Sequence, residues 1–177
     1  FSDGYLANSF IYSKLKSAFK DKERTFEGSF ITELKNENLL YLMEKITDET
    51  TKKLGVEFSL GVNFNSENIF NKGIYKLGKQ SLVFNEYISE INKLISRFDI
   101  EYLEDPLSKE DLPDIGKLKI SYASGNRIFN GDLDNVKRYA KYFNCCVLKL
   151  SEVGSLKKLK KITDFCKNND ISLILEQ

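Results

Sequence analysis

The chain has 177 residues, of which 27 are basic and 26 are acidic, giving a formal net charge of +1. This balance argues against a nucleic-acid-binding protein held by bulk charge and against a polybasic membrane anchor, so neither partner is expected. A hydrophobic fraction of 41% with only 2 prolines is typical of a folded domain with a real core, not of a disordered tail.

The chain contains no histidine, which excludes imidazole bases, Ser-His and Cys-His pairs and His-ligated zinc within it. Carboxylates, lysines, amides and the backbone remain as the groups that could do chemistry. The three cysteines, Cys145, Cys146 and Cys166, lack C-x-x-C spacing and lie in apolar or helix-like segments. They are expected to be buried thiols of a reducing compartment, so the expected location is cytoplasmic.

The first third of the chain has a helical pattern. Apolar residues share one face over residues 11–19 and again over residues 39–46, and residues 25–30 form a turn-like loop between them. We therefore expect a helical segment with a loop over residues 1–55. The start at Phe1, where a natural N-terminus would have Met, suggests a fragment.

From Val56 onward, strand-like and helix-like segments alternate. The predicted strands are residues 56–64, 100–103, 118–124, 145–150 and 171–175. The predicted helices are residues 84–98, 132–143 and 155–169, with Asp132 or Asp134 as the N-cap of the second and a charged connection over residues 108–117. This alternation predicts an α/β domain with a parallel sheet and right-handed crossovers over residues 56–177.

Two folds fit the alternation, a doubly wound sheet and part of an eight-stranded (β/α) barrel. A glycine-rich dinucleotide-binding sequence is missing after every predicted strand, which weakens the first fold. Five strands of a barrel would leave two open edges. We expect further strands of the protein, the N-terminal helices or a partner to cover these edges.

In parallel α/β folds, chemistry gathers at the carboxyl ends of the strands. Five polar residues stand at the predicted strand ends, namely Asn63, Glu104, Asn126, Lys149 and Gln177. They either form one ring of functional groups or are polar only because loops begin there. An unpaired ammonium at Lys149, in the apolar run 147–150, would be costly. Lys149 should therefore pair with a carboxylate, for which Glu104 and Asp105 are available, or act as a base.

Several segments resemble enolase, the phosphopyruvate hydratase family, in the same order and with similar gaps. They are residues 11–17, 26–30, 60–67, 102–106 and 147–155. The resemblance implies an enolase-type (β/α) barrel of which the chain covers only a part, without the family's N-terminal α+β domain. It also implies the Mg²⁺-dependent lyase reaction of glycolysis, from 2-phosphoglycerate to phosphoenolpyruvate, and a dimeric cytosolic protein.

The resemblance assigns roles to individual residues. Glu27 falls on the catalytic acid, Lys149 on the base and Glu104 on a magnesium ligand. Two further metal ligands, which are aspartates in the family, fall on Asn63 and Asn126.

Other positions also depart from the family. The substrate-binding histidine falls on Gln177, and an acidic residue falls on Arg127, which would compete for Glu104 or Asp105. An alternative alignment at residues 131–133 would restore an acid, but it leaves too few residues for a helix before the next strand.

Replacing two carboxylates by neutral amides lowers the ligand charge from about −3 to about −1, so Mg²⁺ is expected to bind weakly or not at all. Electrostatic stabilisation is usually the largest catalytic contribution. The sequence therefore favours a pseudoenzyme with a binding or scaffolding role, as a homodimer or in a larger assembly. Its ligand would be a small phosphorylated acid if the site is functional. The alternative is an active or residually active enolase, supported by Glu27 and Lys149.

Overall fold

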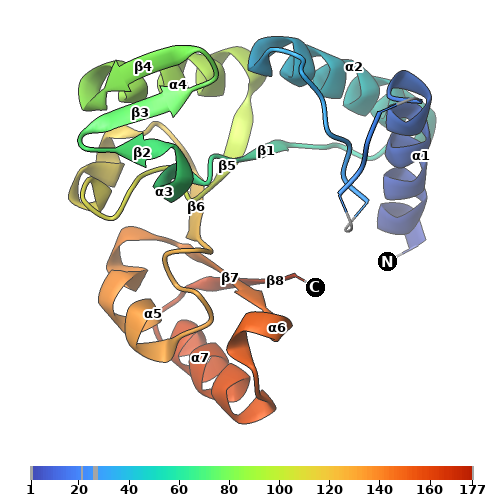
Figure 1. The fold of residues 1–177 in the computed structure, drawn as a ribbon. Coiled ribbons are helices and arrows are strands. Elements are labelled where there is room, and N and C mark those ends of the chain that lie inside the picture. Colours follow the sequence, from blue (N-terminus) through green and yellow to red (C-terminus); the bar gives the residue numbers. More distant parts are fainter. Residues whose placement is uncertain (1, 21, 26–27, 177) are drawn as a thin grey trace. The chain divides into compact units, whose positions relative to one another are not determined.

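The computed structural model describes residues 2–20, 22–25 and 28–176 (Figure 1). The chain divides into two compact units, Phe1–Leu60 and Gly61–Gln177. Among the described residues, no helix combines the length and the apolar character needed to cross a membrane.

The first unit consists of two helices and the loop between them. Helices α1 (Ser2–Ala18) and α2 (Asn36–Leu54) pack against each other, and Lys14 Nζ lies 2.8 Å from Glu49 Oε2 across their interface. In the loop, Arg24 and Phe30 form an isolated antiparallel bridge. The two helices predicted in this region are confirmed, and both extend beyond the predicted bounds.

The second unit is built on a curled, parallel five-stranded sheet in the order β1-β5-β6-β7-β8. The strands are β1 (Leu60–Asn63), β5 (Ile100–Glu104), β6 (Tyr122–Gly125), β7 (Cys145–Lys149) and β8 (Ser172–Glu176). The main helices between them are α4 (Phe84–Phe98), α5 (Leu133–Tyr139) and α7 (Leu156–Asn168). The predicted α/β class and parallel sheet are therefore confirmed.

Four short helical turns complete the connections of the second unit. They are α3 (Ser66–Ile69), α6 (Leu150–Val153) and the 3₁₀ turns at Leu112–Lys117 and Ala140–Tyr142. The last of these takes over the end of the predicted helix 132–143. Asp132 is the N-cap of α5, as predicted, because its Oδ1 accepts the N–H groups of Asp134 and Asn135.

A small antiparallel sheet precedes α4, where the sequence analysis predicted no element. Its strands are β2 (Phe70–Asn71), β3 (Ile74–Leu77) and β4 (Gln80–Val83). The buried Tyr75 of β3 stacks on the buried Tyr87 of α4, with ring centroids 3.8 Å apart and planes 1° from parallel. This stack attaches the small sheet to the helix that crosses over to β5.

Two predicted strands begin four residues too early. Residues 56–59 lie outside β1, and β6 begins at Tyr122 where residue 118 was predicted. β6 begins later than predicted because side chains form hydrogen bonds with the backbone of the residues before it. The N–H of Lys119 donates to Asn92 Oδ1 at 2.9 Å, and Asn144 Nδ2 donates to the carbonyl of Ser121 at 2.7 Å.

The three cysteines are buried free thiols, as predicted. Cys145 and Cys146 lie in β7, and Cys166 lies on the face of α7 that packs toward the sheet. The hydrogen bond to Cys166, together with burial, raises the pKa of the Cys146 thiol. These thiols act as small apolar side chains of the core between sheet and helix.

Candidate functional site

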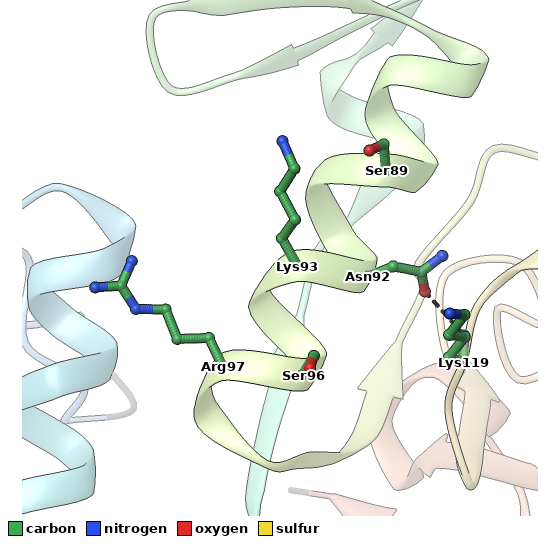
Figure 2. A pocket seen from close by; sticks show the side chains of 6 residues that line it. All are labelled: Ser89, Asn92, Lys93, Ser96, Arg97 and Lys119. Carbon is green, nitrogen blue, oxygen red and sulfur yellow. Dashed lines mark hydrogen bonds between the residues drawn. The ribbon is translucent and has the colours of Figure 1, made fainter.

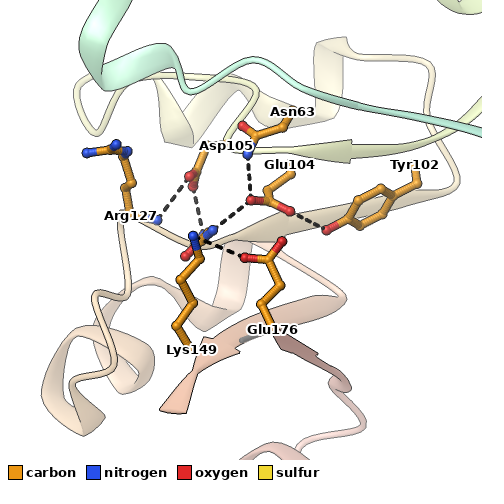
Figure 3. Close-up of polar contacts among 8 residues, drawn as sticks. Asn63, Tyr102, Glu104, Asp105, Arg127, Lys149 and Glu176 are labelled. Carbon is orange, nitrogen blue, oxygen red and sulfur yellow. Dashed lines mark hydrogen bonds and ion pairs between the residues drawn. The ribbon is translucent and has the colours of Figure 1, made fainter. Parts of the chain in front are cut away.

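Polar residues from four strands meet at the carboxyl edge of the sheet (Figure 3). Asn63, Glu104 and Lys149 are the last residues of β1, β5 and β7, and Asn126 follows β6 directly. Because the strands run parallel, their carboxyl ends lie on the same side. The other two predicted site residues, Glu27 and Gln177, lie outside the residues that the structure describes.

Glu104 is the centre of this edge and is 5% exposed. Its Oε1 accepts two amide N–H groups, from Asn63 Nδ2 and Asn126 Nδ2, each at 2.7 Å. Its Oε2 accepts the hydroxyl of Tyr102 at 3.1 Å. Each asparagine thus directs its amide N–H group at the carboxylate. Two metal ligands would instead direct their oxygen atoms at a cation shared with Glu104.

Burial raises the pKa of the Glu104 carboxyl, although the hydrogen bonds from Asn126 and Tyr102 act in the opposite direction. The charges of Glu176 and Asp105 raise this pKa further. Neutral donors therefore bind the Glu104 carboxylate, and the burial of its negative charge costs free energy that a metal ion would offset.

Asp105 holds the turn after β6. It is 1% exposed and has a left-handed backbone, with φ 43°. Its Oδ1 accepts the backbone N–H of Asn126 at 2.8 Å, and its Oδ2 accepts that of Arg127 at 2.9 Å. Burial raises the pKa of Asp105, while these hydrogen bonds and the charge of Arg127 lower it. Both carboxylate oxygens are thus used to position the residue that reaches Glu104.

Lys149 forms an ion pair with Glu176, the residue opposite it in the β7–β8 register. Lys149 Nζ lies 3.2 Å from Glu176 Oε2, and the two side chains are 26% and 40% exposed. The prediction that Lys149 would pair with a carboxylate is confirmed. The partner in this ion pair differs from Glu104 and Asp105, because the strand register places Glu176 directly beside the lysine.

Tyr102, Ser124 and Glu176 also belong to this edge, although they are not among the site residues predicted from the sequence. The Tyr102 hydroxyl lies 2.6 Å from Ser124 Oγ as well as bonding Glu104. A Cβ at Gly61 would lie 2.8 Å from Tyr102 Cδ1, so the glycine allows the ring to lie against β1. The two-residue period of a strand could have identified Tyr102, since it lies two residues before Glu104 and shares its face.

The residues at this edge do not fit Mg²⁺. The ion prefers near-octahedral oxygen ligands with carboxylates among them. Glu104 is the one predicted metal ligand that is a carboxylate, and both lone pairs of its Oε1 are used by amide donors. Across the described residues, no group of three or more His, Cys, Asp or Glu side chains is placed to hold a metal ion.

The alternative alignment, with an acid at Asp132, places that carboxylate elsewhere. Asp132 is exposed and its side chain caps α5. Asn126, in contrast, contacts Glu104 directly. The structure therefore brings Asn126, and not Asp132, to the site.

A hollow of about 520 Å³ lies on the side of α4 and includes Lys119 (Figure 2). It is lined by Ser89, Asn92, Lys93, Ser96, Arg97 and Lys119. The side-chain amide of Asn92 in this hollow already has two structural partners. Its Nδ2 donates to the carbonyl of Lys117 and its Oδ1 accepts the N–H of Lys119, both at 2.9 Å. Lys93 lies 3.3 Å from Glu90 Oε2 in a surface ion pair. We therefore assign the functional edge to Glu104 and its neighbours.

No protein-family profile matches the chain. Curated proteins named enolase do match it. The chain is 22% identical over 184 residues to enolase of Archaeoglobus fulgidus, which covers 99% of the chain and 46% of the relative. It is 26% identical over 160 residues to enolase of Aeropyrum pernix, a match that covers 82% of the chain and 37% of the relative. It is 24% identical over 172 residues to enolase of Methanosphaera stadtmanae, a match that covers 88% of the chain and 42% of the relative.

The chain thus spans less than half the length of these curated relatives. The match to the Archaeoglobus fulgidus protein covers 99% of the chain, so it runs through both units and through the segments that carry the resemblance in the sequence. The chain is a divergent enolase-like protein.

Proposed function

We propose that this chain is part of an enolase-derived pseudoenzyme, in which the barrel edge has lost its metal chemistry and serves binding or scaffolding. One observation carries the proposal, namely that Asn63 and Asn126 both direct amide N–H groups at Glu104 Oε1. A ligand set for Mg²⁺ would direct oxygen atoms at a common point.

The loss of the metal would remove the main source of catalysis. In the reaction implied by the family, the cation stabilises a dianionic intermediate, and a lysine base alone cannot replace it. Lys149, at the position of the base, is held by Glu176. The ion pair therefore gives the retained lysine a structural explanation that does not require catalysis.

The proposal extends to the rest of the architecture. Residues 1–55 would form the helical segment with the active-site-like loop, and residues 56–177 would be part of an eight-stranded enolase-type barrel. β1 and β8 are the outer strands of the sheet, and the relatives are more than twice as long as the chain. Further strands of the protein or a second copy would cover these edges, in a cytoplasmic homodimer or larger assembly.

The test is turnover of 2-phosphoglycerate by the full-length protein with excess Mg²⁺, followed as phosphoenolpyruvate formation. The proposal predicts no phosphoenolpyruvate above the background without protein. Magnesium-dependent turnover that Lys149→Ala abolishes would establish the alternative, a residually active enolase.

A further inference from the structure

The Asn126 side chain has an acceptor without a partner at the centre of the site. Asn126 is 5% exposed, and its Oδ1 is buried and accepts no hydrogen bond in the part of the chain that the structure describes. Rotating the amide by 180° would not help, because it would place Oδ1 against Glu104 Oε1, where Nδ2 now donates at 2.7 Å. A buried acceptor in this state calls for a donor that the described residues do not supply.

Two carboxylates beside Asn126 also have acceptor positions left. Glu104 Oε2 receives the Tyr102 hydroxyl and has a second lone pair. Glu176, whose Oε2 binds Lys149, has a second carboxylate oxygen, and its side chain points toward Glu104 in Figure 3. A group that completes this edge must therefore donate hydrogen bonds.

The charges at this edge favour a positively charged donor group over an anion. Three carboxylates and two cations lie there, namely Glu104, Asp105, Glu176, Lys149 and Arg127. The Arg127 charge acts on Asp105, and the Lys149 charge is paired with Glu176. The donors that bind Glu104 are neutral, namely the amides of Asn63 and Asn126 and the Tyr102 hydroxyl. A phosphorylated acid would bring further negative charge to it and would be repelled.

We propose that this edge binds a primary ammonium group, which donates to Asn126 Oδ1 and to Glu104 in place of the family's divalent cation. The inference rests on the proposed function, because it requires a site without Mg²⁺. An ammonium group combines a positive charge, which is attracted to Glu104, with the directed N–H donors that the Asn126 carbonyl needs. The ligand class is a small primary amine or a lysine side chain of a partner.

Thermal unfolding of the chain with two salts tests this inference. Methylammonium chloride offers charge and N–H donors, whereas tetramethylammonium chloride offers the same charge without donors. At equal ionic strength, we expect methylammonium to raise Tm saturably, by about 2–4 °C, and tetramethylammonium to leave it unchanged. Nα-acetyl-lysine methylamide in the same assay tests whether the donor of a lysine side chain reaches the site; a rise favours a partner lysine, and no rise favours a small amine.

Two variants locate the effect. Asn126→Ala removes the acceptor and should abolish the response to methylammonium. Asn85→Ala, at an exposed position of α4 outside this edge, is the control and should keep the response. If Asn126→Ala fails to fold, the near-isosteric Glu104→Gln, which lacks the negative charge, should reduce the response instead.

The outcomes separate this inference from the proposed function. An equal rise with tetramethylammonium or potassium chloride, or an unchanged response in Asn126→Ala, would overturn donor recognition. No response to any ammonium salt would mean that water serves Oδ1, and would overturn this inference while the absence of turnover still supported the pseudoenzyme. Turnover of 2-phosphoglycerate with Mg²⁺ would overturn both.

Discussion

Lys149 and Glu176 face each other at the ends of β7 and β8, with Nζ and Oε2 3.2 Å apart. The lysine that the family resemblance places at the catalytic base is thus one half of a partly buried ion pair. Such a pair gives the residue a structural reason to stand at the end of an apolar strand, independent of any reaction.

The ion pair should be measurable as a coupling energy. We expect a double-mutant cycle of Lys149→Met and Glu176→Gln, measured by urea unfolding, to give a coupling of up to about 1 kcal/mol, because both groups retain some solvent contact. The exposed pair Lys160–Asp164 is the matched control and should couple less. Equal coupling energies for the two pairs would argue that Lys149 and Glu176 interact only as surface charges.

The raised pKa of Glu104 predicts a pH dependence of stability. The folded state holds this proton at pH values where the unfolded chain, with the ordinary pKa of 4.5, has released it. The stabilising contribution is therefore complete below the unfolded pKa and is lost as the pH rises through the folded pKa. Since Glu104→Gln is neutral at every pH, it should lack this loss and be at least as stable as the wild type at pH 7.

The measurement is the free energy of unfolding of both proteins between pH 4 and pH 8, at roughly constant ionic strength. Glu110→Gln, at an exposed position on the loop after β5, is the control and should follow the wild-type curve. A Glu104→Gln variant that is much less stable than the wild type at pH 7 would show that a charged Glu104 stabilises the fold, contrary to this account.

Asp105 should matter more for stability than an exposed aspartate such as Asp114. Asp105→Asn keeps the shape but replaces one acceptor by an N–H₂ donor, which leaves the backbone N–H of Asn126 or Arg127 without a partner. We expect a loss of about 1–3 kcal/mol in urea unfolding. Asp114→Asn, which removes a surface ion pair with Lys117, should cost less than about 1 kcal/mol. Similar losses in the two variants would contradict the assigned role of Asp105.

The three cysteines should be unreactive in the folded protein. All three are buried. Burial raises the pKa of Cys145, and the hydrogen bond with Cys166 together with burial raises the pKa of Cys146, which disfavours the reactive thiolate at both. Titration with a thiol reagent should therefore detect about 0 thiols without denaturant and 3 with it. Rapid labelling of a cysteine under native conditions would show that α7 opens from the sheet.

The sequence could predict the α/β class because its hydrophobic pattern agrees with the tertiary structure in the second unit. The helix predicted over residues 84–98 is α4 with the same bounds, since its apolar residues, from Tyr87 to Phe98, repeat at helical spacing and are all buried. The β2–β4 sheet could not be found in this way, because strands of two to four residues carry too little periodicity.

Part of the site could also be predicted, because parallel strands bring their last residues to one edge. This geometry identified Asn63, Glu104, Asn126 and Lys149 without knowledge of side-chain contacts. The partner of Lys149 could not be found, since it depends on the register between β7 and β8. The orientation of the two amides depends on hydrogen bonds that only the three-dimensional arrangement defines.

In the proposed function, two amides turned toward Glu104 take the place of a magnesium site. Calorimetric titration of Mg²⁺ into the wild-type chain and into the double variant Asn63→Asp with Asn126→Asp decides whether they do. We expect no saturable binding by the wild type at millimolar Mg²⁺, and clear binding by the double variant, whose three carboxylates then meet at one edge. Saturable binding of Mg²⁺ by the wild type, lost in Glu104→Gln, would show that the wild-type edge is still a magnesium site.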